Sequence, residues 1–288
     1  MNDFEKALDF TTESLRKLSE TGSNLRGSRE SLRRLAAARP KPADIQPASS
    51  APAPAPKPVA PPIPQAAKPE PLSISMEVFP TSGKTKFERI EQLRAAVAPC
   101  VKCPKLAATR TQTVFGVGNI DARIMFVGEA PGADEDLQGE PFVGRAGQLL
   151  TKIIQAMGVN RSDVYIANVL KCRPDMPPGS SGNRRPTATE MQTCLPYLRS
   201  QIEIIKPAVL VALGAVAMEG LLGSVEPMAR LRGRWHEFQG IPLMATYHPA
   251  YLLRNQSLTE KRKVWEDMLM VMEKVELPIT AKHRGYFL

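Results

Sequence analysis

Two glutamates in one glycine-bearing loop are the first residues of this sequence that could do chemistry. Glu129 and Glu135 belong to the stretch GEAPGADEDLQGEPFVGRAGQLL, residues 128–150. The stretch is neither a P-loop nor a dinucleotide-binding fingerprint, because it lacks both GxxxxGK[ST] and GxGxxG. Its five acidic residues argue further against a bound phosphate. A glycine-shaped loop with solvated carboxylates is the alternative, and we expect Asp134 and Asp136 to be solvated.

A histidine in the stretch HPAYLLRN, residues 248–255, is the second candidate. His248 follows an apolar run and precedes Pro249, so we expect it at the end of a strand. A histidine in such a place more often caps or packs. If it shares a crevice with the acidic loop, it becomes a candidate hydrogen-bond donor to a substrate oxygen.

The four cysteines form the third group. One C-x2-C pair and two single cysteines are present, at Cys100, Cys103, Cys172 and Cys194. A zinc ribbon usually carries two C-x2-C pairs, and four thiolates can equally hold a 4Fe-4S cluster. Spacing does not separate these metals, and buried cysteines without a metal are a further alternative. One site that uses every cysteine is the most economical account.

Short apolar runs alternate with helical patterns from about residue 84 onward. This order predicts an α/β fold, a three-layer α/β/α sandwich around a central, mainly parallel, four-stranded sheet. We expect strands at 123–128, 164–170, 208–214 and 242–247. Helical spacing is found at 87–97, 147–158, 187–206, 215–223 and 259–275.

Ligands of such folds lie beyond the carboxyl ends of the strands. The segments that follow the expected strands at this edge are 128–142, 168–174 and 246–254. We therefore expect the acidic loop and His248 to face the same crevice.

The N-terminal part differs in composition from the rest. Residues 40–71 hold 12 of the 27 prolines, which predicts a semi-extended linker. The expected organisation is a weakly helical or disordered extension at 1–39, a Pro/Ala-rich linker at 40–80 and a catalytic domain at 81–288. Docking of an unidentified protein partner on the extension is an alternative to disorder.

The net charge and the pattern of apolar residues indicate which partners and which compartment we expect. The net charge is +9, which is compatible with a polyanionic partner. The sequence shows no secretory signal and no apolar run long enough to span a bilayer. We expect a cytoplasmic monomer that does not bind membranes and whose cysteines are not in disulfides.

Several motifs together resemble one known family. The stretches VFGVGNIDARIMFVGEAPGADEDLQGEPFVGRAGQLL, NVLKCRP, GNRRPT and HPAYLLR, with four cysteines in this order, are similar to the family 4 iron-sulfur uracil-DNA glycosylases. The likeness covers roughly residues 84–275. It implies a glycosylase-like fold, a 4Fe-4S cluster on the four cysteines, and hydrolysis of the N-glycosidic bond of uracil in DNA. The abasic site that remains would start base-excision repair. The loop DMPPGSSGNRRP is longer than the family's usual turn.

The resemblance also implies how the uracil base is held. Phe142 would stack on the extruded base. The Asn168 amide would donate to uracil O4 and accept from N3–H, a pattern that cytosine reverses. His248 would donate to O2 as negative charge accumulates on the leaving base. The remaining substrate-binding candidates are Gly128, Ala130 and Asn183.

The water-positioning residue is less well defined. Better-known uracil glycosylases carry an Asp at the position of Ala130. We therefore expect Glu129 or Glu135 to hold the water and stabilise the sugar cation. Glu135 has a second role open to it, the exclusion of thymine by crowding C5.

The remaining candidates would contact the DNA. Leu252 or its neighbour Tyr251 would wedge into the stack that the base leaves, with burial in the core as the alternative for both. Contacts to backbone phosphates are expected from Arg145, Arg184, Arg185 and Arg254.

Other possible functions differ from this one in substrate specificity or in chemistry. Family 5 glycosylases of broader range lack the carboxylates of GEAPGADED. A relative that links covalently to uracil sites uses a histidine in the segment CRPDMPPGSSGNRRPT, which here has none. A non-catalytic iron-sulfur protein for DNA binding or electron transfer is the alternative from another class.

Overall fold

The computed structural model describes residues 77–177 and 182–288. The expected N-terminal extension lies outside this range, as does the linker except for residues 77–80. The expected catalytic domain is therefore the part whose structure is given below.

Six strands form one mixed sheet in the order β1-β3-β2-β4-β6-β5. The four expected strands are confirmed as its parallel centre: β2 (Ile124–Gly128), β3 (Tyr165–Asn168), β4 (Val209–Leu213) and β6 (Ile241–Thr246). The count of four was wrong, because β1 (Val117–Gly118) and β5 (Trp235–Phe238) extend the sheet antiparallel at its two edges. Neither edge strand has the continuous apolar run that marks the centre.

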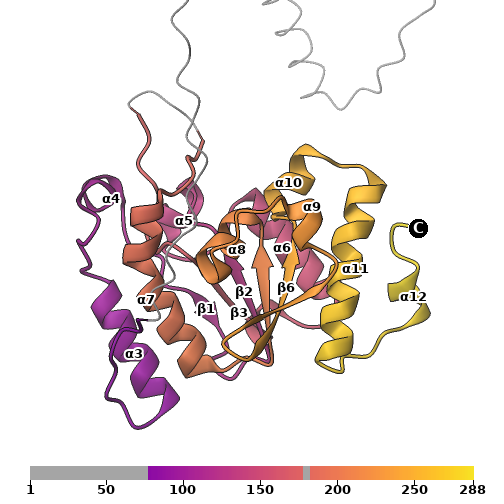
Figure 1. Ribbon diagram of the computed structural model, residues 1–288, viewed down its shortest axis with the longest axis horizontal. Coiled ribbons are helices and arrows are strands. Elements are labelled where there is room, and N and C mark those ends of the chain that lie inside the picture. The colour runs from indigo at the N-terminus through magenta and orange to yellow at the C-terminus, as the bar shows by residue number, and fades with distance from the viewer. Residues whose placement is uncertain (1–76, 178–181) are drawn as a thin grey trace, which may run out of the picture. The chain divides into compact units, whose positions relative to one another are not determined.

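Helices cover both faces of the sheet (Figure 1). Successive strand residues point to opposite faces, so Met125 and Val127 pack on one side while Ile124 and Phe126 pack on the other. The first face is covered by α3 (Lys86–Val97), α7 (Ala188–Ile205) and α8 (Ala215–Leu222). The second is covered by α6 (Arg145–Ala156) and α11 (Leu258–Lys274). The three-layer α/β/α sandwich is confirmed.

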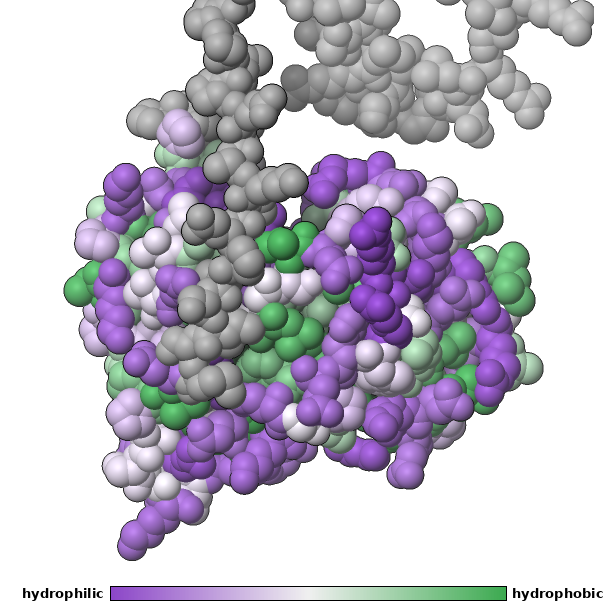
Figure 2. Space-filling view, viewed as in Figure 1, coloured by the Kyte–Doolittle hydropathy of each residue, from purple (hydrophilic) through white to green (hydrophobic). Residues whose placement is uncertain are grey.

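Shorter helices complete the described structure. They are α4 (Pro104–Thr109), α5 (Ala133–Gln138), the 3-10 turn η1 (Arg161–Asp163), α9 (Met228–Leu231), α10 (Pro249–Arg254) and α12 (Ala281–Arg284). Figure 2 shows hydrophilic residues over most of the viewed face, with small apolar areas between them. In the described part of the chain, no helix is both long and apolar enough to cross a membrane.

Three chain segments leave the sheet at the same edge. Gly128 at the end of β2 is paired with Asn168 at the end of β3. Leu213 at the end of β4 is paired with Thr246 at the end of β6. Because these strands are parallel, the acidic loop, the loop after β3 and the segment that begins with His248 start at one edge of the sheet, as expected.

Candidate active site

Gly128 makes room for two side chains that the sequence places far apart. A Cβ atom at this position would lie 2.4 Å from Asn168 Oδ1 and 2.5 Å from Phe142 Cζ. Both distances are too short for real atoms, so only glycine allows the amide and the aromatic ring to approach each other here. The structure thus brings together three of the expected substrate-binding residues.

The Asn168 side chain has an unsatisfied hydrogen-bonding group. The residue is 2% exposed, and its Oδ1 has no hydrogen-bond partner among the described residues. A buried acceptor without a donor costs about 1–3 kcal/mol. A ligand with an N–H group at this place would remove that cost.

Phe142 is held in a backbone conformation that side chains rarely adopt. Its φ is 56°, in the left-handed region that non-glycine residues enter at a cost. The first turn of α6 packs directly on it, since a Cβ at Gly147 would lie 1.8 Å from the Phe142 carbonyl oxygen. The ring centroid lies 5.5 Å from that of His248, with a tilt of 31°. The ring therefore lies next to that of the histidine.

His248 is the N-cap residue of α10, and its two ring nitrogens differ. Nδ1 accepts a hydrogen bond from the Ala250 backbone N–H at 3.1 Å. Burial, and next the positive charge of Arg254, lower the pKa of His248 to about 4. The ring is therefore neutral near pH 7, and because Nδ1 is an acceptor, its proton is on Nε2. His248 presents a neutral N–H donor.

Both oxygens of Glu135 are bonded to the backbone of its own loop. Oε2 accepts from Gly132 N, and Oε1 accepts from Val143 N and from Gly144 N, each at 3.0 Å. These bonds fix the acidic loop around the start of α5 and the start of α6. Glu135 thus has a structural use that the sequence did not reveal.

Glu129 has a different environment. It is half-buried, and burial raises its pKa, an effect that the positive charge of Arg185 partly offsets. Its neighbour Ala130 is also half-buried. The surroundings of Glu129 therefore destabilise its carboxylate charge, as in many catalytic carboxylates.

The two aspartates of the loop differ in burial. Asp134 is exposed, as expected. The expectation for Asp136 was wrong, because it is 4% exposed and its Oδ2 accepts from Thr111 N at 2.9 Å. It is placed inward by the helical turn of α5, whose position within the fold could not be known from the sequence.

The GNRR segment contacts the acidic loop and α8. A Cβ at Gly132 would lie 3.3 Å from Asn183 Nδ2, so this exposed asparagine adjoins the acidic loop. Arg184 forms ion pairs with Asp175 and with Glu190.

Arg185 forms an ion pair with the buried carboxylate of Glu219 on α8. Both arginines of the segment are therefore paired within the protein. Their expected contacts with phosphates stay predictions, and Arg185 has the more exposed side chain, 50% against 27% for Arg184.

Two more expected DNA contacts are accessible. Arg145 and Arg254 are exposed. Tyr251 is half-buried, its hydroxyl donates to Glu260 Oε2 at 3.2 Å, and its ring lies 4.6 Å from that of Tyr247.

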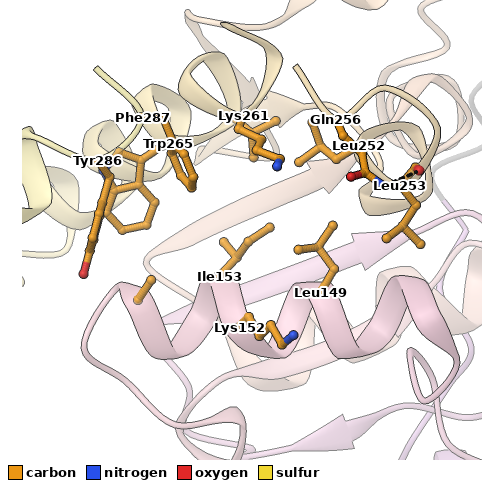
Figure 3. Close-up of a pocket in the computed structure, with 12 residues that line it drawn as sticks. Leu149, Lys152, Ile153, Leu252, Leu253, Gln256, Lys261, Trp265, Tyr286 and Phe287 are labelled. Carbon is orange, nitrogen blue, oxygen red and sulfur yellow. Dashed lines mark hydrogen bonds between the residues drawn. The ribbon is translucent and has the colours of Figure 1, made fainter. Parts of the chain in front are cut away.

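Leu252 is turned into the protein. It is 4% exposed and lines an apolar pocket between α6, α10 and α11. Leu149 and Ile153 point into this pocket from α6 (Figure 3). The prediction of a wedge is therefore wrong for Leu252, because α10 begins at Pro249 and its helical turn directs this side chain to the core. The adjacent Leu253 is half-buried.

All four cysteines line one cavity. The group also accepts hydrogen bonds: Arg110 Nη1 donates to Cys172 Sγ at 2.9 Å, the Lys171 backbone N–H donates to Cys194 Sγ at 3.2 Å, and the Tyr197 hydroxyl donates to Cys100 Sγ at 3.5 Å. Within 77–177 and 182–288, no three Cys, His, Asp or Glu side chains converge closely enough to hold a single metal ion.

Lys171 is a residue of this region that the sequence analysis missed. It is 1% exposed, and its Nζ donates to the Asn168 backbone oxygen at 2.9 Å and to Gln201 Oε1 at 2.6 Å. Burial lowers its pKa to about 8. The buried ammonium fixes the end of β3 next to the Asn168 side chain. The available signal in the sequence was the place of this lysine, directly between an apolar strand and a cysteine. A lysine is rarely buried unless its ammonium group has a partner.

Comparisons with known proteins identify one superfamily. The family model of the uracil DNA glycosylase superfamily matches residues 115–269. The type-4 uracil-DNA glycosylase of Thermotoga maritima is 46% identical over 186 residues, which are 64% of this chain and 93% of the relative. That of Archaeoglobus fulgidus is 42% identical over 183 residues, 61% of this chain and 88% of the relative. The type-5 uracil-DNA glycosylase of Pyrobaculum aerophilum is 30% identical over 185 residues, 53% of this chain and 79% of the relative.

Proposed function

The chain belongs to the uracil-DNA glycosylase superfamily and, within it, to the type-4 glycosylases, and from this membership we propose that it hydrolyses the N-glycosidic bond of uracil in DNA. The observation that carries the proposal is the buried, unpartnered Asn168 Oδ1 beside Gly128 and Phe142. An imide N–H is the donor that this acceptor lacks. Uracil has such a group at N3, whereas cytosine has an acceptor there.

The extruded base stacks on Phe142 and binds the Asn168 amide edge to edge. Asn168 Oδ1 accepts from N3–H, and Nδ2 donates to O4. Extruded cytosine would place its N3 acceptor against Oδ1 and its N4 amino group against Nδ2. Two mismatched polar contacts in a buried site disfavour it strongly.

Bond cleavage follows from the arrangement of His248. Its neutral ring donates from Nε2 to uracil O2 as the electrons of the glycosidic bond move to N1. The low pKa that burial gives His248 keeps the ring from becoming a full cation, so the residue acts as a hydrogen-bond donor. The departing base is stabilised as an anion, and C1′ of the sugar becomes electron-poor.

Water completes the hydrolysis at C1′. The water oxygen bonds to C1′ and the water releases a proton to solvent, while the departing uracil anion takes up a proton from solvent, which leaves an abasic site and free uracil. We assign Glu129 to hold this water and to offset the charge of the sugar, because both oxygens of Glu135 are already bonded to backbone amides. Glu135 then acts by shaping the loop.

The cysteine cavity fits an iron-sulfur cluster. The four cysteine sulfurs line one cavity, which supports a 4Fe-4S cluster held by all four. The donors from Arg110, the Lys171 backbone and Tyr197 are of the kind that stabilise thiolate ligands. When bound, such a cluster would tie the start of α4, the loop after β3 and α7 together.

The DNA contacts are proposed from the accessible side chains. Arg145 and Arg254 bind backbone phosphates, and Tyr251 or Leu253 replaces the extruded base in the stack. The cytoplasmic location, the monomeric state and a partner for the N-terminal extension stay predictions from the sequence.

A labelled oligonucleotide with one uracil tests the proposed function. Incubation with the purified protein and then alkali should break the strand at the uracil, and the same oligonucleotide with cytosine or thymine should stay intact. An uncleaved uracil strand, with the protein folded and its visible iron-sulfur absorbance present, contradicts the proposal. It would favour the non-catalytic alternative.

A further inference from the structure

A polar hollow of about 420 Å³ lies on the cluster side of the base pocket. Arginine and other polar side chains from α3, from the segment after α4 and from the end of α5 line it. Those that matter here are Arg94, Arg110, Thr111, Gln112, Thr113 and Gly139. Two guanidinium groups around one open hollow favour an anionic ligand.

Arg94 is oriented before any ligand binds. Its guanidinium lies 4.6 Å from the centroid of the Phe115 ring, and its Nε is paired with Glu91 Oε1 at 3.1 Å. The side chain is 47% exposed. These contacts hold the planar group in place, which lowers the entropy lost when an oxyanion binds.

Arg110 is oriented as well. Its Nη1 donates to Cys172 Sγ at 2.9 Å, so its position is fixed by the proposed cluster site. The segment that follows is anchored to α5: Thr111 N donates to Asp136 Oδ2 at 2.9 Å, and Gln112 Nε2 donates to the Leu137 carbonyl oxygen at 2.9 Å. The wall of the hollow is therefore rigid on this side.

Gly139 closes the hollow at the end of α5. Its φ is 78°, and a Cβ there would lie 2.7 Å from Gln112 Oε1. Glycine therefore lets Gln112 lie against the helix end. The helix C-cap, the glutamine and the two arginines form one continuous surface.

The hollow is a short distance from the base pocket. Helix α5 begins after Gly132, which the side chains of Glu135 and Asn183 both approach, and ends before Gly139 in the hollow. Six helical residues span about 9 Å. The hollow is therefore close enough to the base pocket for one DNA strand to reach both.

We propose that this hollow binds a backbone phosphate of the DNA strand, held between Arg94 and Arg110. The inference rests on the proposed function and adds a phosphate site on the side of the base pocket opposite to α10. A polymer backbone suits an open hollow better than a free nucleotide does, because the chain can enter and leave it on either side. The net charge of +9 is of the required sign.

The salt dependence of DNA affinity tests this site. The Kd for an undamaged duplex is measured between low and moderate salt for the unaltered protein and for Arg94→Ala. Loss of the Arg94 contact should lower the magnitude of the slope of log K against log salt by at most about 0.9, because Arg110 remains beside the same phosphate. Arg94→Lys should keep the slope, because an ammonium still neutralises one phosphate. Arg110 is left unaltered, since it contacts a cysteine of the proposed cluster site.

Arg89→Ala is the matched control, because Arg89 is on the same helix but is paired with Glu203 and lies outside the hollow. Its slope should equal that of the unaltered protein. An unchanged slope for Arg94→Ala, or an equal loss for Arg89→Ala, overturns the proposal. Excision of uracil is measured in parallel and should stay unchanged in Arg89→Ala. Failure of every variant and of the unaltered protein to excise uracil would contradict the proposed function, while the slopes still decide the phosphate site.

Discussion

Gly128 and Asn168 face each other at the paired ends of β2 and β3, so closely that a single methyl group on Gly128 would lie 2.4 Å from Asn168 Oδ1. The Phe142 ring meets the same point from the side of the acidic loop. In the proposed function, recognition of the base would depend on the absence of a side chain at this one residue. The glycine would then be as important for function as the asparagine.

Gly128→Ala should reduce uracil excision on the order of 10²-fold, because the amide or the ring must shift by about 1 Å to admit the methyl group. Single-turnover rates with a uracil oligonucleotide measure the effect. Gly240→Ala is the control, because a Cβ there meets nothing within 4 Å and its φ of 79° makes the substitution costly in stability alone. Equal rates for Gly128→Ala and the unaltered protein would contradict the close approach.

Asn168→Asp should relax the discrimination against cytosine, because a protonated carboxyl can donate where the amide oxygen only accepts. Excision of uracil should fall, while release of cytosine from a cytosine oligonucleotide should become detectable. The control is Asn119→Asp, since the exposed Asn119 uses only its Oδ1, which accepts from Asp121 N at 2.9 Å. Unchanged selectivity in Asn168→Asp would count against base reading by this residue.

Glu129→Gln and Glu135→Gln should have opposite effects on activity and stability. Glu129→Gln removes a charge that burial disfavours, so the thermal midpoint should hold while the single-turnover rate falls on the order of 10²-fold. Glu135→Gln replaces an acceptor of three backbone N–H groups by an amide that can accept on one atom only, which should cost about 1–3 kcal/mol of stability.

Thermal denaturation and single-turnover excision, measured on the same preparations, separate the two roles. Full stability of Glu135→Gln together with a lost rate would return the catalytic role to Glu135. A Glu129→Gln protein with the full rate would remove it from Glu129.

Replacement of Cys172 by serine should abolish the visible iron-sulfur absorbance and lower the thermal midpoint, because one of four ligands is lost and the loop after β3 is released. Iron content and absorbance after anaerobic purification measure the first effect. Thr193→Ser is the control, because Thr193 lines the same cavity without being a ligand candidate. Zinc in place of iron in the unaltered protein would contradict the proposed cluster.

The centre of the fold and the position of the site could be predicted, because they follow from local patterns. Strands β2, β3 and β4 are entirely buried, so each is a continuous apolar run, and parallel strands place their carboxyl ends together. The edge strands could not be found in this way. Val117–Gly118 is too short to carry a pattern, and in Trp235–Phe238 only the last residue is buried.

The roles within the loop depend on contacts that the sequence does not encode locally. Glu135 reaches Val143 and Gly144 only because the loop closes on the start of α6. Leu252 was misplaced for a different reason. Pro249 marks the first residue of α10, and counting from it would have set the helical phase, but which side of that helix faces α6 is a tertiary fact.

The pH dependence of stability provides a test of His248. Its folded-state pKa is about 4, below the ordinary value of 6.5, so between these two values the unfolded chain binds more protons than the folded protein. The contribution of His248 to stability is therefore complete above about pH 6.5 and is lost as the pH falls toward 4. Urea unfolding at several pH values should show a free energy of unfolding that decreases across this window. In His248→Gln this part of the decrease should be absent, since glutamine does not titrate. An unaltered pH dependence in the variant would show that the histidine is solvated and charged in the ordinary way.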